Sequence, residues 1–215
     1  CRMELVSPHP LVSVPSGEDV EKRAAVTSPS LEERQVAGID IFIEVTLPPP
    51  TLVIVGGVHM AIALTEIANT LGYCTVVVDP RRAFGSSERF PNADQLLHSW
   101  PDKALSQVGI STSTAVAVLT HDPKLDDPAL QVALPSAAFY VGALGSRSTN
   151  AKRRERLLQS GLLEAHLNRL NAPIGLDLGG NTPEEIALAV MAQVVASRHR
   201  FAAAATSQHV TDKVD

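Results

Sequence analysis

The sequence feature that most constrains the fold is a short apolar run that ends in two glycines and leads directly into a helical pattern. Residues Thr51–Val55 (TLVIV) are followed by Gly56 and Gly57, and apolar residues then recur at helical spacing over residues 60–71. Such a short, continuous apolar run is typical of a strand in a parallel sheet that is covered on both faces. Glycine suits the turn, because φ can be positive there and a phosphate can approach the backbone. The pattern predicts a βαβ unit.

The same alternation of strand and helix continues to the end of the apolar part of the chain. Periodicity predicts further strands at 75–78, 115–119, 138–144 and 174–178, and further helices at 128–134, 152–159 and 182–199. The last helix has a capping box, with Thr182 as N-cap, Pro183 at the first helical position and Glu185 at the third. Short connections between alternating elements predict an α/β fold with a Rossmann-like, doubly wound parallel sheet.

Three consecutive prolines at positions 48–50 divide the chain into two parts of different character. The N-terminal part is rich in Pro, Ser and Glu, and only residues 39–46 alternate apolar and acidic side chains as a half-buried strand does. We predict an N-terminal arm or remnant subdomain with its linker over 1–49, a Rossmann-like domain over 50–200 and a flexible tail over 201–215.

Composition and charge exclude several classes of function. The net charge is −5 and no basic stripe is present, which argues against binding to nucleic acid. The sequence has no signal-peptide pattern and no apolar run of about 20 residues, so we predict a cytoplasmic protein without a membrane span. Two cysteines give no zinc-like spacing, and no catalytic triad or P-loop motif is present, so neither a metal site nor catalytic residues are predicted.

Ligands of this fold bind at the carboxyl ends of the strands, and the first strand end carries the strongest signal. There the helix N-terminus offers unpaired N–H groups to an anion. In the dinucleotide fingerprint G-x-G-x-x-G/A the three key positions are Gly56, Val58 and Ala61, so a branched side chain replaces the middle glycine. We predict a phosphate-bearing ligand, bound by Gly56, Gly57, Val58, His59 and Met60.

The second strand ends at Asp79, at about the 20-residue offset from Gly56 at which an acid holds a ribose diol. Pro80, Arg81 and Arg82 follow at once. Two arginines beside a diol site favour an additional phosphate. The alternative is that they are solvated surface charges.

The later strand ends supply the remaining candidates for the same crevice. These are His121, Asp122, Gly145, Ser146, Arg147, Asp177 and Gly179. His121 either contacts a ligand or caps its own loop, and Gly145 to Arg147 resemble an anion nest with a guanidinium beside it. The predicted helix at 152–159 carries Arg153, Arg154 and Arg156, which either dock an acidic partner or form a solvated face.

Taken in order, these motifs resemble the xanthine dehydrogenase accessory protein family (XdhC/CoxI). The matching segments, between about residues 39 and 200, are IVGGVHMA, VVVDPRRAF, ERFPNAD, LTHD, YVGALGSR and RLNAPIGLDLGGNTPEEIALAVMAQVVASR. The resemblance implies a chaperone, rather than a catalyst, that binds the molybdenum cofactor (molybdopterin) and protects it during sulfuration. It also implies delivery to a molybdenum hydroxylase client such as xanthine or carbon monoxide dehydrogenase, with a cysteine desulfurase as a further partner.

Two departures from the family pattern leave alternatives open. The family turn usually reads G-A-G-H-V-A, and the family's N-terminal domain usually ends in a Cys-Gly-Gly-like segment, where this chain has residues 36–38 (VAG). They indicate a divergent or shortened N-terminal part. The alternatives are an NAD(P)-binding oxidoreductase and a non-catalytic nucleotide-binding protein, and pairing into a homodimer stays open for all three.

Overall fold

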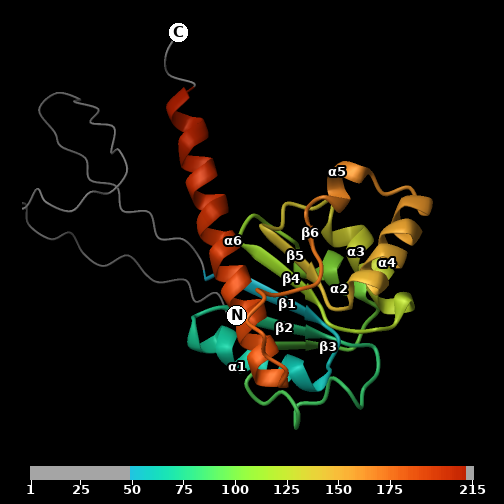
Figure 1. Ribbon diagram of the computed structural model, residues 1–215. Helices are drawn as coiled ribbons and strands as arrows, with labels where there is room; N and C mark the ends of the chain where they lie inside the picture. Colours follow the sequence, from blue (N-terminus) through green and yellow to red (C-terminus); the bar gives the residue numbers. More distant parts are fainter. Residues whose placement is uncertain (1–48, 212–215) are drawn as a thin grey trace, which may run out of the picture. The chain divides into compact units, whose positions relative to one another are not determined.

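A computed structural model gives the fold and describes residues 49–211; the predicted arm and the predicted strand at 39–46 lie outside the described residues. The described elements, in chain order (Figure 1), are β1 (Thr51–Val55), α1 (His59–Thr70), β2 (Cys74–Val78), β3 (Gln95–Leu97), α2 (Pro101–Val108), β4 (Thr114–Val118), α3 (Pro123–Ala133), β5 (Tyr140–Ala143), α4 (Arg147–Gln159), α5 (Glu164–Leu167), β6 (Leu170–Asn171) and α6 (Pro183–Thr211).

The strands form one six-stranded parallel sheet in the order β3-β2-β1-β4-β5-β6. This order confirms the predicted Rossmann-like doubly wound sheet, because the chain first builds outward from β1 to β3 and then returns to β4 on the other side of β1. Val55 is in register with Val78 of β2 and with Val118 of β4. The three central strands therefore end level, and the residues after them meet at one edge.

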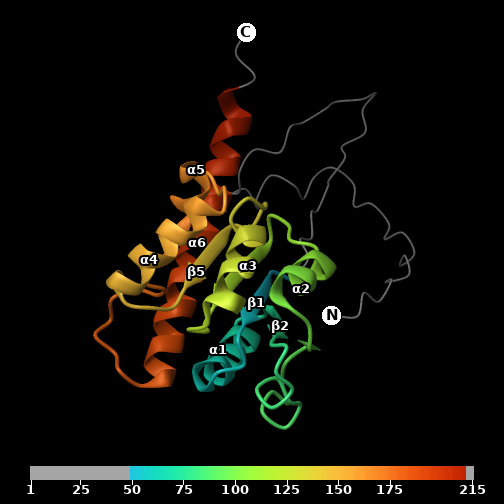
Figure 2. The same ribbon diagram turned by 90° about the vertical axis from the view of Figure 1, so that its right-hand side faces the viewer.

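Alternating side chains of the strands face two separate cores, one on each side of the sheet. Helices cover both faces of the sheet, with α1 and α6 on one side and α2 and α3 on the other (Figure 2). Leu52 and Ile54 pack toward α1 and α6, whereas Val53 and Val55 pack toward α2 and α3. All four side chains are fully buried. Burial of one such side chain contributes about 1.5–3 kcal/mol, so the apolar run that is visible in the sequence anchors the middle of the sheet.

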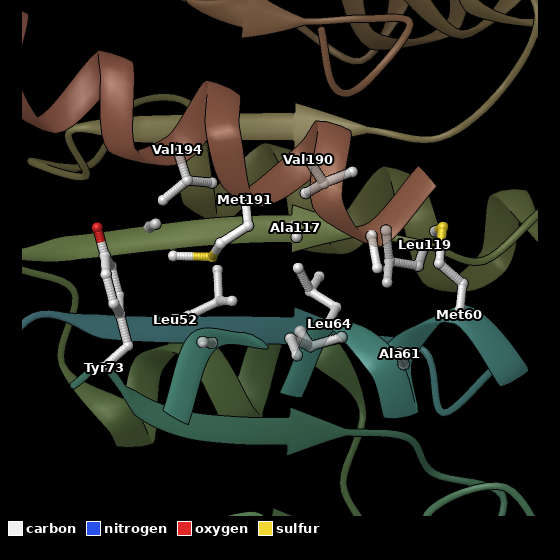
Figure 3. Packing of buried hydrophobic residues seen from close by; sticks show 14 of the residues in the cluster. Leu52, Met60, Ala61, Leu64, Tyr73, Ala117, Leu119, Val190, Met191 and Val194 are labelled. Atoms are coloured by element: carbon white, nitrogen blue, oxygen red, sulfur yellow. The ribbon is translucent and has the colours of Figure 1, made fainter. Parts of the chain in front are cut away.

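Helix α6 packs along α1 and over the central strands (Figure 3). Val190, Met191 and Val194 of α6 point toward Leu52 of β1 and Leu64 of α1. The amino end of α6 is closed as predicted, because Glu185 N–H donates to Thr182 Oγ1 (3.2 Å) and Thr182 N–H donates to Glu185 Oε2 (3.0 Å). This capping box is confirmed. The helix continues to Thr211, beyond the predicted end at residue 199.

The predicted strand at 174–178 is wrong. Gly175 has φ +92°, which is incompatible with an extended strand, and its N–H donates to Gln193 Oε1 of α6 (2.8 Å). Leu176 N–H donates to the carbonyl of Ala189, also on α6 (3.1 Å). The backbone of this segment therefore bonds to the side of α6; Ile174 is buried in the core, whereas Leu176 and Leu178 are exposed. The sixth strand is the earlier pair Leu170–Asn171.

Four elements, β3, α2, α5 and β6, were not predicted, and each of them is short. Strand β3 is a three-residue edge strand of exposed or half-buried side chains, and α2 spans eight residues. Conversely, α3 begins at Pro123, before the predicted start at 128. Pro128, predicted from the sequence as the first residue of the helix, lies inside it.

Candidate functional site

An open cleft of about 410 Å³ lies where β1 and β4 end, at the point where the strand order reverses. Its lining consists of Val58, Arg81, Thr120, His121, Asp122 and Pro123. The cleft has the size of small-molecule sites in proteins, and it lies at the place where open α/β sheets bind ligands. It brings together four of the predicted residues, Val58, Arg81, His121 and Asp122.

The turn from β1 into α1 is held tightly from both neighbouring strands. Gly56 N–H donates to the carbonyl of Val78 (2.8 Å). Gly56 has φ +106°, and a Cβ atom on it would lie 2.4 Å from Thr120 Cγ2. Glycine is therefore required here for backbone conformation and for space.

The amino end of α1 leaves backbone donors open at the cleft. Val58 is the N-cap, no side chain caps the helix, and its first turn has no acidic residue. The first N–H groups of a helix have no partner inside the helix, and they carry a partial positive charge. His59 is exposed at the start of the helix, whereas Met60 is buried in the core under it.

Asp79 is buried beside the turn, and its carboxylate is fully engaged by the chain. Oδ1 accepts from the N–H and the Nε of Arg81, each at 2.9 Å. Oδ2 accepts from Gly57 N–H (2.9 Å) and from Arg81 Nη2 (2.8 Å). Burial alone would raise the pKa of Asp79, but the hydrogen bonds from Arg81 and Gly57 outweigh burial and hold it below its usual value.

The β4 end contributes a helix cap and an exposed imidazole. Asp122 is the N-cap of α3 and accepts from Lys124 N–H (3.0 Å). The hydrogen bond from Arg81 to Asp79 and the nearby charge of Asp122 both raise the pKa of Arg81. His121 is exposed on the cleft wall. The wall thus offers a guanidinium, an imidazole and helix N–H groups, a donor set that suits an anionic ligand.

A buried polar cluster beneath the cleft was not predicted; we call it the buried brace, and it consists of Thr120, Asp126, Asn150 and Arg153. Arg153 Nη2 donates to Asp126 Oδ2 (2.8 Å) and to the carbonyl of Leu144 (3.0 Å). Arg153 Nη1 donates to Asn150 Oδ1, and Thr120 Oγ1 donates to Asp126 Oδ1. The brace ties the ends of β4 and β5 to α3 and α4, and through Thr120 it reaches the cleft.

The remaining predicted residues do not line the cleft. Ser146 caps α4, accepting from Thr149 N–H (3.2 Å), next to Gly145 with φ +140°. Arg147, Arg82, Asp177 and Gly179 are exposed, and Pro80 is half-buried. Asp177 and Gly179 follow no strand, because the segment before them packs on α6.

The sequence left two interpretations of the arginines of the 152–159 helix, an acidic partner or a solvated face, and the structure instead pairs each of them within the chain. Arg153 is buried with Asp126, each side chain 2% exposed. Arg154 pairs with Glu164, and Arg156 donates to both carboxylate oxygens of Asp127 (2.7 and 3.0 Å). All three guanidinium groups are therefore occupied within the chain. The helical periodicity of the sequence does not reveal this, because the acids lie on α3 and α5.

Two further observations apply to the described residues only. Between residues 49 and 211 no three His, Cys, Asp or Glu side chains gather as a metal site would require. None of the helices in this range is long and apolar enough to cross a membrane.

Comparison with known proteins identifies the family. Residues 52–194 match the model described as the XdhC Rossmann domain. A probable xanthine dehydrogenase subunit of Bacillus subtilis (strain 168) is 32% identical over 163 residues, which is 76% of this chain and 47% of that protein. The "Molybdenum cofactor insertion chaperone PaoD" of Escherichia coli (strain K12) is 35% identical over 99 residues, 46% of this chain and 30% of that protein.

A solved structure supports the same relationship at the level of the fold. The crystal structure described as a xanthine dehydrogenase from Bacillus halodurans is 30% identical, with a TM-score of 0.62, and the match covers 71% of this chain and 44% of that one. The chain thus spans less than half the length of each of these relatives.

Proposed function

Because this chain belongs to the family of the XdhC Rossmann domain, we propose that it is an accessory protein for a molybdenum hydroxylase of the xanthine or carbon monoxide dehydrogenase type. Its role would be to bind the molybdenum cofactor and deliver it, rather than to catalyse a reaction of its own. A cysteine desulfurase as second partner and assembly into a homodimer stay predictions.

The observation that carries this proposal is the cleft at the end of β1 and β4. It combines the uncapped amino end of α1 with the guanidinium of Arg81 and the imidazole of His121. Molybdopterin ends in a phosphate, which is the group that helix N–H donors and arginine bind best. The naming of PaoD as a molybdenum cofactor insertion chaperone supports the same cargo.

The residues present fit the phosphate end of the cofactor better than its metal end. Val58 N–H, the first turn of α1 and Arg81 would hold the phosphate, and His121 would contact a polar edge of the pterin. No cysteine lines the cleft within residues 49–211. We therefore assign the described part of the chain to holding the organic part of the cofactor, and derive no chemistry at molybdenum.

The test is mass spectrometry of the small molecules released from protein purified out of a molybdenum-replete host. A molybdopterin derivative, retained by the wild type and lost in Gly56→Val, is the expected result. Gly56→Val blocks the turn against Thr120, and Gly161→Ala, at an exposed glycine with φ +92° and open space around its Cβ, is the matched control for glycine replacement.

Release of NAD(P) instead would favour the oxidoreductase alternative, and an adenine nucleotide would favour a non-catalytic nucleotide-binding protein. A second readout is the activity of a purified molybdenum hydroxylase that is reconstituted with and without the protein. A protein that neither retains a pterin nor raises this activity would contradict the proposal.

A further inference from the structure

The segment that follows β2 lies directly on the glycine turn. Arg89 Nη1 donates to the carbonyls of Gly57 (2.6 Å) and Phe84 (2.8 Å). A Cβ atom on Gly57 would lie 2.2 Å from the carbonyl oxygen of Phe84. The Gly57 N–H is already taken by Asp79. The chain itself thus fills the space above the turn on the β2 side, and no ligand phosphate can approach the backbone at Gly57.

Asp79 stands where a dinucleotide-binding fold places the acid that holds the ribose diol. A carboxylate has about four acceptor positions, and the four hydrogen bonds from Arg81 and Gly57 use all of them. Asp79 is only 1% exposed. A ribose hydroxyl can therefore reach this carboxylate only if the Arg81 side chain leaves it.

Arg81 is held in this position from a second side. Its guanidinium carbon lies 4.0 Å from the centre of the Phe84 ring, a cation–π contact within the same segment. The side chain stays 40% exposed and lines the cleft. The Arg81 side chain therefore covers the carboxylate of Asp79 on one side and faces the open cleft on the other.

We propose that Arg81 is the specificity-determining residue of the cleft. By occupying the carboxylate of Asp79 it excludes nicotinamide dinucleotides. It leaves only the part of the crevice between the ends of β1 and β4 for a ligand, which must then have a single phosphate end. This inference rests on the proposed function in taking the cleft as the ligand site. It explains why a chain with the strand order and the acid of a dinucleotide-binding protein would carry a different cofactor.

The test is a fluorescence titration with NADH on variants of the full chain. Val58 is a separate obstacle to the pyrophosphate, so Val58→Gly is the common background. V58G with Arg81→Ala should bind NADH at least ten-fold more tightly than V58G alone. V58G with Arg82→Ala is the matched control, because it removes the same charge from an exposed neighbour outside the cleft lining; it should bind as V58G does.

Two more variants test whether any gain in NADH affinity depends on the carboxylate of Asp79. Adding Asp79→Asn to the V58G/R81A variant should abolish the gain, and NADPH should show none, because its 2′-phosphate would be repelled by Asp79. V58G with Arg81→Lys keeps a positive charge beside Asp79 and should bind NADH with intermediate affinity. It also serves as the test if V58G/R81A lacks the circular dichroism spectrum of the folded chain.

Equal NADH affinity of V58G and V58G/R81A would overturn the inference. A gain in NADH affinity in the V58G/R82A control would also overturn it, as would a gain that persists when D79N is added to V58G/R81A. Absence of a released pterin would remove the proposed function without affecting this comparison, because the titration reads the role of Arg81 by itself.

Discussion

Two buried aspartates, Asp79 and Asp126, each pair with an arginine near the carboxyl edge of the sheet, yet their surroundings differ. Asp79 is paired with Arg81, two residues away, whose side chain is 40% exposed. Asp126 is paired with Arg153 of another helix, and each of these side chains is 2% exposed. The first pair borders the cleft, and the second lies sealed beneath it.

The pKa values of the two acids are shifted in opposite directions from the ordinary value of an aspartate. Hydrogen bonds from Arg81 and from backbone N–H groups overcome burial at Asp79 and lower its pKa. At Asp126 desolvation by burial prevails over the hydrogen bonds from Thr120 and Arg153, so the pKa is raised. Arg153 Nε also has no hydrogen-bond partner within the described residues. The comparison teaches that the pair at the edge leaves its arginine open to solvent and to the cleft, whereas both partners of the sealed pair lie inside the fold.

Breaking the sealed pair should have the largest effect. We expect Arg153→Met to lower the free energy of unfolding by about 3–5 kcal/mol at neutral pH, because it leaves the Asp126 carboxylate buried without its cation. Urea unfolding followed by circular dichroism measures this. The double variant D126L/R153M should recover most of the loss, since it removes both charges; a loss below about 1 kcal/mol in R153M would show that the brace is not sealed.

Breaking the pair at the cleft should cost less. We expect Arg81→Met to lower the free energy of unfolding by about 1 kcal/mol, because solvent reaches the arginine and Asp79 keeps its bonds to the N–H groups of Gly57 and residue 81. The same urea experiment applies. A loss as large as that of R153M would remove the distinction between the two pairs.

The effect of Arg81→Met should depend on pH. The pKa of folded Asp79 lies below its ordinary value of 3.8, so its contribution to stability is present above that value and is lost as the pH falls through the lowered pKa. The difference between wild type and R81M is therefore expected to be constant from about pH 7 to about pH 5 and to shrink below about pH 4. A difference that grows on acidification would contradict the assignment.

The smallest effect on stability is expected at a third ion pair, between Arg156 and Asp127. This pair extends the comparison to two side chains that are both partly open to solvent. Its side chains are 39% and 18% exposed. Arg156→Ala should lower the free energy of unfolding by about 0.5 kcal/mol, and the loss should decrease further in high salt, because solvent screens this pair. Thermal unfolding at low and high salt measures both; an effect above about 2 kcal/mol would place this pair with the sealed one.

Much of the fold was predictable because its signals are local. The apolar run of β1, the glycine turn and the capping box of Thr182 and Glu185 each depend on residues only a few positions apart. The segment at 174–178 was mispredicted because its backbone N–H groups bond to α6 while Leu176 and Leu178 stay exposed, and a short apolar run does not distinguish a strand from an irregular segment against a helix. The parts of the site that were predicted, Val58, Arg81, His121 and Asp122, directly follow or cap elements that the sequence makes visible.

The sequence by itself determined the alternation of buried strands and helices, the turn that needs glycine at position 56, and the acid at the end of the second strand. These follow from hydrophobic burial and backbone sterics, which act between near neighbours. Only the tertiary structure decided that Arg81 occupies Asp79 and that Arg153 is buried against Asp126 instead of facing a partner. The physical reason is that a buried charge must find a partner, and which groups are within reach depends on where distant strand ends meet.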